Sequence, residues 1–234
     1  MLVKGWMSSD VISVEEETSM MKASVLMKEN NIRRLPVVRK GKLVGLVTDT
    51  DLKEASPSKA TTLDIYEISY LLSEIKVKEL MSKNVTYVKP DETIEFAAVL
   101  MLENKISGLP VINDQQNLIG VITETDIFKA LIHITGVYNG DTQFALCLRD
   151  KPGSVHEVAD VIRNMGGRVV SILTSYDLAD EGYRNVYFRI RHMEHDRLVK
   201  LVNILEEKFT VLYTVKESLE KVADRRLHKD YESS

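Results

Sequence analysis

Gly45-Leu46-Val47-Thr48-Asp49-Thr50-Asp51 and Gly120-Val121-Ile122-Thr123-Glu124-Thr125-Asp126 share one pattern, an apolar run followed by Thr-x-Thr-Asp. A short apolar run of this kind is typical of a buried strand. Thr and Asp after such a run predict the start of a helix, because their side chains accept hydrogen bonds from the first free backbone amides. The same strand-to-helix junction therefore occurs twice in this chain.

The repeat extends upstream of both junctions. Residues 3–55 align with residues 77–130, and the matched stretches include Val3-Lys4-x-x-Met7-Ser8 with Val77-Lys78-x-x-Met81-Ser82. Leu35-Pro36-Val37 likewise matches Leu109-Pro110-Val111. A repeat unit of this size buries too little apolar surface alone, so we expect the two copies to pair.

Each copy predicts the order strand, helix, strand, strand, helix. The first helix of each copy follows Thr18 or Thr93, and the last begins at Asp51 or Asp126. Between the copies, Leu63, Tyr66, Ile68 and Leu71-Leu72 predict a helix that packs back on the pair. The expected strands are residues 11–14, 35–38 and 43–47 in the first copy, and 85–88, 109–112 and 118–122 in the second.

The last third of the chain has another order. Helical stripes at 155–165 and 198–205 alternate with expected strands at 142–148, 169–175, 185–190 and 209–215. The order βαββαβ is that of ferredoxin-like domains.

Composition excludes several classes of protein. The 234 residues are 44% hydrophobic with a net charge of −4, which gives no whole-chain basis for binding nucleic acid. No apolar stretch reaches the length of a membrane span, and Met1–Trp6 lacks the apolar core of a signal peptide. Cys147 is the single cysteine. We expect a cytoplasmic protein without a disulfide.

The two copies resemble CBS domains. The resemblance rests on Met-x-x-x-Val-x-x-Val, on Ile-x-x-Leu-Pro-Val and on Gly-x-x-Thr-x-x-Asp, all in order and twice. It implies an α/β (α+β) chain in which a tandem CBS module binds an adenine nucleotide. The layout is also similar to that of acetoin utilization proteins of the AcuB type. We expect CBS motifs at 1–58 and 77–136, a linker helix at 59–76, an ACT-like domain at 137–216 and a charged tail at 217–234.

The C-terminal domain resembles an ACT domain, through the loop Asp150-x-Pro152-Gly153 and the turn that begins at Asn164. ACT domains commonly bind amino acids at the first loop. The resemblance therefore implies an amino acid or small metabolite near Asp150, Pro152, Gly153 and Asn164.

Thr48/Asp51 and Thr123/Asp126 are the leading site residues. Each hydroxyl precedes a helix, where free amides favour a phosphate, and each carboxylate suits a ribose diol. In the CBS family the matching residues contact phosphate and ribose. The alternative is that both pairs are helix caps alone.

Arg33-Arg34 stands where the second copy has Ser107-Gly108. Guanidinium groups bind phosphate in a bidentate fork, so we expect unequal clefts, with the first motif supplying the positive charge. The alternative is a solvated loop. Apolar residues around an adenine slot (Val14 and Val37, with Val88 and Val111) could equally be core. The remaining nucleotide-site candidates are Met7, Ile12, Ile32, Pro36, Thr50, Thr86, Ile106, Pro110 and Thr125.

These residues favour a non-catalytic regulatory sensor with no catalytic cofactor. A homodimer and a regulated metabolic enzyme are the expected partners, carried by the resemblance, with no nucleic acid and no membrane. The alternative is an interaction scaffold with degenerate clefts. An enzyme is disfavoured because no general base faces a nucleophile. His192-x-x-His195 has no third ligand nearby, so we predict no metal site.

Overall fold

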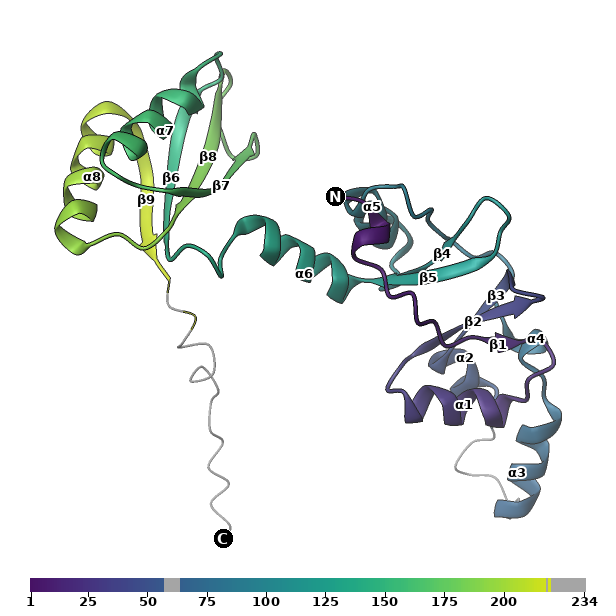
Figure 1. Cartoon of the computed structure of the whole chain (residues 1–234). Helices are drawn as coiled ribbons and strands as arrows, with labels where there is room; N and C mark the ends of the chain where they lie inside the picture. The colour runs from purple at the N-terminus through teal and green to yellow at the C-terminus, as the bar shows by residue number, and fades with distance from the viewer. Residues whose placement is uncertain (57–63, 218, 220–234) are drawn as a thin grey trace, which may run out of the picture. The chain divides into compact units, whose positions relative to one another are not determined.

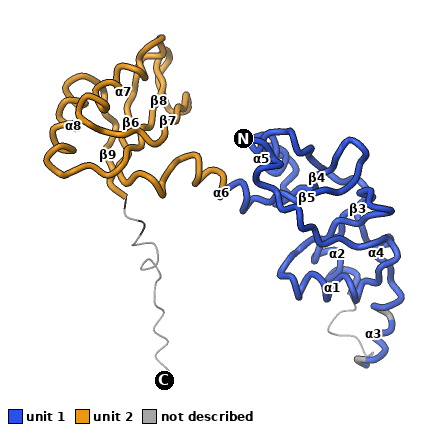
Figure 2. Tube along the Cα trace, in the orientation of Figure 1, with its two compact units in different colours: residues 1–128 blue, residues 129–234 orange. Residues whose placement is uncertain are grey.

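The computed structural model describes residues 1–56, 64–217 and 219. The chain divides into two compact units, residues 1–128 and residues 129–234 (Figure 2). The boundary falls inside helix α6 (Glu124–Thr135), which begins in the first unit and ends in the second. Mixed helices and strands throughout confirm the predicted α+β class.

The first repeat forms the predicted order of elements. A short 3-10 helix, η1 (Val3–Gly5), opens the chain. A three-stranded sheet has β1 parallel to β2 and β2 antiparallel to β3. The elements that follow η1 are β1 (Val14–Glu15), α1 (Met20–Glu29), β2 (Arg34–Arg39), β3 (Lys42–Thr48) and α2 (Asp49–Glu54).

The second repeat has the same order of elements, but its first strand is reduced to a single bridge. Val88 pairs with Val111 through a single parallel bridge, in the position that β1 holds in the first repeat. The other elements are α5 (Ile94–Asn104), β4 (Gly108–Ile112), β5 (Leu118–Thr123) and α6.

Three predicted helix starts are wrong by one or two residues. Ser19, not Thr18, caps α1, because its hydroxyl accepts the amide of Lys22. The helices expected at Asp51 and Asp126 begin earlier, at Asp49 and Glu124. Thr48 takes the cap position, which leaves Asp51 as the third helical residue, where it completes a capping box.

The linker between the repeats contains α3 (Ile65–Glu74), followed by α4 (Val77–Leu80). Leu72 packs against the core of the first repeat, in agreement with the prediction. Tyr66, in contrast, is 82% exposed and makes no part of that packing. Leu63 and the Pro57-Ser58 stretch lie outside the described residues.

The two repeats exchange their leading segments. Val3 donates its amide to the carbonyl of Glu92 in the second repeat, at 2.8 Å. Val77, the counterpart of Val3, donates to Thr18 in the first repeat, at 2.9 Å. Each segment therefore completes the other repeat, and the unit has an approximate internal two-fold symmetry.

A methionine of each leading segment covers a glycine in a strand of the other repeat. A Cβ added at Gly45 would lie 2.4 Å from the sulfur of Met81. At Gly120 it would lie 2.5 Å from the sulfur of Met7 and 3.1 Å from the carbonyl oxygen of Ser8. A side chain at Gly45 would displace that of Met81, and one at Gly120 would also press on the backbone of the crossing segment.

The second unit is a four-stranded antiparallel sheet in the order β7-β8-β6-β9, with α7 and α8 on one face (Figure 1). Its core includes Phe144, Phe188, Ile162 and Leu201, all fully buried. The predicted βαββαβ order is confirmed. The bounds are β6 (Thr142–Arg149), α7 (Ser154–Asn164), β7 (Val169–Ser175), β8 (Tyr183–Ile190), α8 (His195–Lys208) and β9 (Thr210–Lys216).

We predict that Gly45 and Met81 are energetically coupled. Gly45→Ala should destabilise the chain by about 1–3 kcal/mol through overpacking. The double variant with Met81→Ala should be less destabilised than the two single changes together, by about 1 kcal/mol. Urea unfolding of the four proteins measures this difference.

Gly5→Ala is the matched control, because an added Cβ there meets nothing within 4 Å. It should leave the unfolding midpoint unchanged or raise it slightly. Strict additivity of Gly45→Ala and Met81→Ala would contradict the crossing contact.

Candidate functional site

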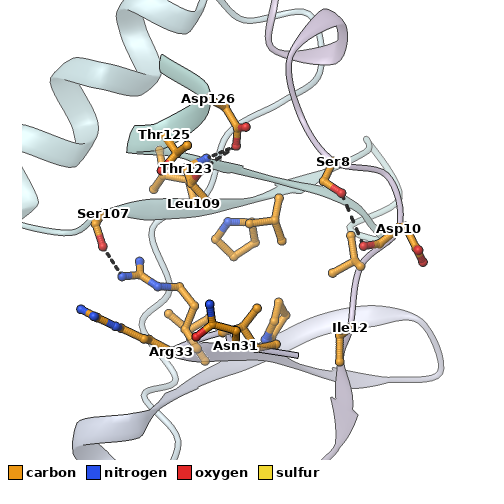
Figure 3. Close-up of a pocket in the computed structure, with 17 residues that line it drawn as sticks. Ser8, Asp10, Ile12, Asn31, Arg33, Ser107, Leu109, Thr123, Thr125 and Asp126 are labelled. Carbon is orange, nitrogen blue, oxygen red and sulfur yellow. Dashed lines mark hydrogen bonds between the residues drawn. The ribbon is translucent and has the colours of Figure 1, made fainter. Parts of the chain in front are cut away.

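A cavity of about 410 Å³ lies between the two repeats of the first unit. This volume is within the range of roughly 300–1,000 Å³ that is usual for small-molecule pockets. Figure 3 shows Thr123, Thr125 and Asp126 on one side of the cavity. Ile12, Asn31 and Arg33 lie on the opposite side, and Ser107 stands at one end. Both repeats therefore contribute to one site.

The leading segment of the first repeat crosses to the second repeat and there forms part of the cavity wall. Ser8 and Val121 form an antiparallel bridge, with reciprocal backbone hydrogen bonds of 2.9 Å. The chain continues from Ser8 through Asp10 and Val11 along the cavity wall. Met7, one residue earlier, packs on Gly120 and does not line the cavity.

The two Thr-Asp pairs have the same geometry. Asp126 Oδ2 accepts the Thr123 amide at 3.0 Å and the Thr123 hydroxyl at 2.7 Å. Asp51 Oδ2 accepts the Thr48 amide and hydroxyl, both at 2.7 Å. Each carboxylate is thus held at the first turn of its helix. The capping function considered from the sequence is present in both repeats, and only the Thr123/Asp126 pair lines the cavity.

The two arginines have different surroundings. Arg34 is half-buried and donates to the Gly108 carbonyl at 3.0 Å and to the Ser107 hydroxyl. Burial lowers the pKa of its guanidinium, against the opposing effect of Glu124 and Asp49. Arg33 is exposed and lines the cavity. Arg33 is the better placed of the two to meet a ligand, since Arg34 is already engaged by the second repeat.

Arg34 and Gly108 occupy matching positions in the two repeats, and the structure brings them together. One position carries an arginine and the other a glycine. The two repeats therefore differ in charge at the symmetry axis. Arg33 and Arg34 both line the cavity, but the guanidinium of Arg34 is held by Ser107 and Gly108 of the second repeat.

The structure divides the predicted nucleotide-site residues into two sets. Those that line the cavity are Ile12, Ile32, Arg33, Arg34, Pro36, Ser107, Pro110, Thr123, Thr125 and Asp126. Those outside its lining are Met7, Thr48, Thr50, Asp51, Thr86, Ile106 and Gly108. Most of the second set, including Thr48, Asp51 and Thr86, are the counterparts of lining residues under the internal symmetry.

Sequence reasoning missed seven lining residues. Asn31 has a φ of 51°, a left-handed conformation that its counterpart Lys105 shares with a φ of 54°. Asn is tolerant of that conformation, and this was the one local signal available. The missed residues are Ser8, Asp10, Val11, Asn31, Leu46, Leu109 and Val121.

The valines assigned to an adenine slot belong to the core. Val14 is 5% exposed, and Val37, Val88 and Val111 are fully buried. Their side chains are buried in the hydrophobic core and do not line the cavity. The core interpretation of these four residues is therefore the correct one.

The residues expected to bind an ACT-type ligand are not gathered together. Asp150 and Gly153 precede α7, and Asn164 is the last residue of that helix. Its 11 residues separate the two groups by roughly 16 Å at 1.5 Å per residue. Asp150 lies 3.5 Å from Arg184, and Gly153 has a φ of 88° that suits glycine at the helix entry.

His192, one of the two histidines of the His-x-x-His pattern, has a carboxylate partner. His192 Nδ1 lies 2.9 Å from Asp141 Oδ2. Burial acts to raise the pKa of Asp141, but hydrogen bonds from His192 and Thr142 outweigh it and lower that pKa. Among the described residues, no group of three or more His, Cys, Asp or Glu side chains could hold a metal ion. No described helix is long and apolar enough to cross a membrane.

The comparisons with known proteins agree with the repeat. The CBS domain family model matches residues 3–58 and 77–133. A CBS domain-containing protein of Dictyostelium discoideum is 32% identical over 134 residues, which cover 57% of this chain and 92% of that protein.

Two solved structures are similar to the same part of the chain. A putative acetoin utilization protein (AcuB) from Vibrio cholerae is 27% identical, covering 59% of this chain and 95% of that one, with a TM-score of 0.49. CBSX2 in complex with AMP is 29% identical, covering 57% of this chain and 98% of that one, also with a TM-score of 0.49. On the family model and the Dictyostelium relative, the chain belongs to the CBS domain family and carries a tandem pair of CBS domains.

Proposed function

We propose that the cavity between the CBS domains binds an adenine nucleotide and that the chain is a regulatory sensor. The single observation that carries the proposal is the meeting of Arg33 with Thr123 and Asp126 around one cavity. A cation, a hydroxyl and a carboxylate in one pocket match the phosphate and ribose of a nucleotide. Ile12, Ile32 and the two prolines supply apolar and backbone surface for the base.

Each group has a specific part in this proposal. The Asp126 carboxylate accepts hydrogen bonds from the two ribose hydroxyls, since carboxylates accept several donors. The Thr123 and Thr125 hydroxyls and the start of α6 face the phosphate, where the helix dipole favours negative charge. Arg33 neutralises the remaining phosphate charge.

The nucleotide would bias the arrangement of a homodimer and, through it, a metabolic enzyme. A small metabolite at the ACT-like unit would add a second input, and the coupling between two such inputs is reciprocal in free energy. Within this proposal the protein is cytoplasmic and non-catalytic. The AcuB-like layout associates it with acetoin utilization.

We predict that Asp126→Ala weakens AMP binding at least tenfold in calorimetric titration. The reason is the loss of the charge-assisted hydrogen bonds to the ribose, each contributing about 1.5–3 kcal/mol. Asp51→Ala is the matched control, because Asp51 makes the same capping bonds but lies outside the cavity lining. Its AMP affinity should stay within about threefold of the parent.

Titration with AMP, ADP, ATP, NAD and S-adenosylmethionine tests the proposal as a whole. Heat from at least one of them at micromolar affinity is expected. Absence of heat from all five would reject nucleotide binding and leave the interaction scaffold with degenerate clefts as the better account.

Arg33→Ala should reduce the affinity for ATP more than the affinity for adenosine. The expected loss for ATP is roughly tenfold at low salt, and it should shrink as salt screens the charge. Arg39→Ala is the control, because Arg39 is also exposed on β2 but is paired with Glu16 and does not line the cavity. Equal losses for ATP and adenosine would exclude a phosphate contact at Arg33.

A further inference from the structure

A second cavity, of about 320 Å³, lies entirely within the second unit. It is formed where α7 ends, β7 begins, β8 ends and α8 begins. Three of its eight lining residues are arginines and one is a histidine, and its single acidic lining residue is Glu194. The lining residues are Gly166, Gly167, Arg168, Arg191, His192, Met193, Glu194 and Arg197.

The three arginines are held close together without acidic partners. Among the residues that the structure describes, none of Arg168, Arg191 and Arg197 takes part in a salt bridge. Three other described arginines of this unit have a carboxylate partner: Arg163 pairs with Asp160, Arg184 with Asp150 and Arg189 with Glu217. Three arginines without a carboxylate partner among the described residues therefore line one cavity.

Two of these arginines, Arg168 and Arg191, lie opposite each other at the ends of neighbouring strands. The Arg191 amide donates to the Arg168 carbonyl at 2.9 Å, just beyond the last ladder pair, Val169 and Ile190. Like charges placed directly opposite on neighbouring strands repel and destabilise the sheet. A bound anion would remove that repulsion. The pair of arginines is therefore suited to form one side of an anion site.

Two glycines, Gly166 and Gly167, line the cavity beside the arginines. Gly166 has a φ of 80° and a Cβ there would stand 3.7 Å from a terminal nitrogen of Arg197. Gly167 admits no side chain, because its Cβ would lie 2.9 Å from the Ile162 carbonyl oxygen. The first turn of α8 borders the same space, where its dipole adds to the positive potential.

We propose that this cavity binds a phosphate-bearing small molecule. Guanidinium groups form bidentate hydrogen bonds to phosphate, and three of them around one cavity suit a dianion or a diphosphate better than a single carboxylate. The volume suits a small phosphorylated compound. This site lies in a different unit from the CBS cavity and does not rest on the nucleotide proposal.

Titration of the full-length protein with pyrophosphate at low salt tests this site, followed through the backbone amide signals of Gly166 and Gly167. We expect a saturable shift of both signals. The double variant Arg168→Gln, Arg191→Gln should weaken binding at least tenfold. Parallel titrations with inorganic phosphate and AMP identify which phosphate source the cavity prefers.

Arg163→Gln is the control for net charge, because Arg163 is an exposed arginine on the neighbouring helix but is paired with Asp160. Its affinity should stay within about twofold. Glu194→Gln gives an opposite test, since it removes the single carboxylate of the lining without removing a cap bond, and it should tighten binding several-fold. The proposal is overturned by the absence of a saturable shift, by an equal loss in Arg163→Gln, or by unchanged affinity in Glu194→Gln.

Discussion

The reciprocal crossing of the two leading segments is the contact on which the CBS module depends. Met7 rests on Gly120 and Met81 rests on Gly45, and each crossing is fixed by backbone hydrogen bonds in both directions. Because each repeat lacks its own leading segment, neither is a closed unit. The same crossing sets the composition of the cavity, since it carries Ser8 to Ile12 of the first repeat past the strand that ends at Thr123.

Internal symmetry gives most of the predicted site residues in the cavity lining a counterpart outside it, and the two repeats differ in the residues at the axis. Arg34 donates hydrogen bonds to the Ser107 hydroxyl and the Gly108 carbonyl, so it joins the repeats at their matching positions. Arg33 is left for the cavity that contains Thr123 and Asp126. Asp51 and Asp126 accept the same two hydrogen bonds, from the amide and hydroxyl of Thr48 and Thr123, but only Asp126 lines the cavity. The same Thr-Asp hydrogen bonding therefore occurs once in the cavity lining and once outside it.

The second unit distributes its charge in a different way. Most of its buried or half-buried arginines are neutralised by carboxylates on neighbouring elements, as Arg184 and Arg189 are. The cavity at the start of α8 is different, because it is lined by three exposed arginines, Arg168, Arg191 and Arg197. If both cavities bind phosphate-bearing compounds, the chain has one input in each unit, joined by the continuous helix α6.

The sequence by itself determined the repeat, the order of nearly all helices and strands and the βαββαβ order of the last third, because apolar periodicity and capping residues act over a few positions. It also predicted Arg33, Thr123 and Asp126 as site residues, and all three line the cavity. It left Val14 and Val37 open between core and ligand pocket, since an apolar residue in a core strand and one in a pocket have the same local pattern. Which Thr-Asp pair meets the arginines was decided only by the tertiary structure. The exchange of segments joins residues as far apart in the sequence as Ser8 and Val121, and no local pattern distinguishes pairing within a repeat from pairing across the two.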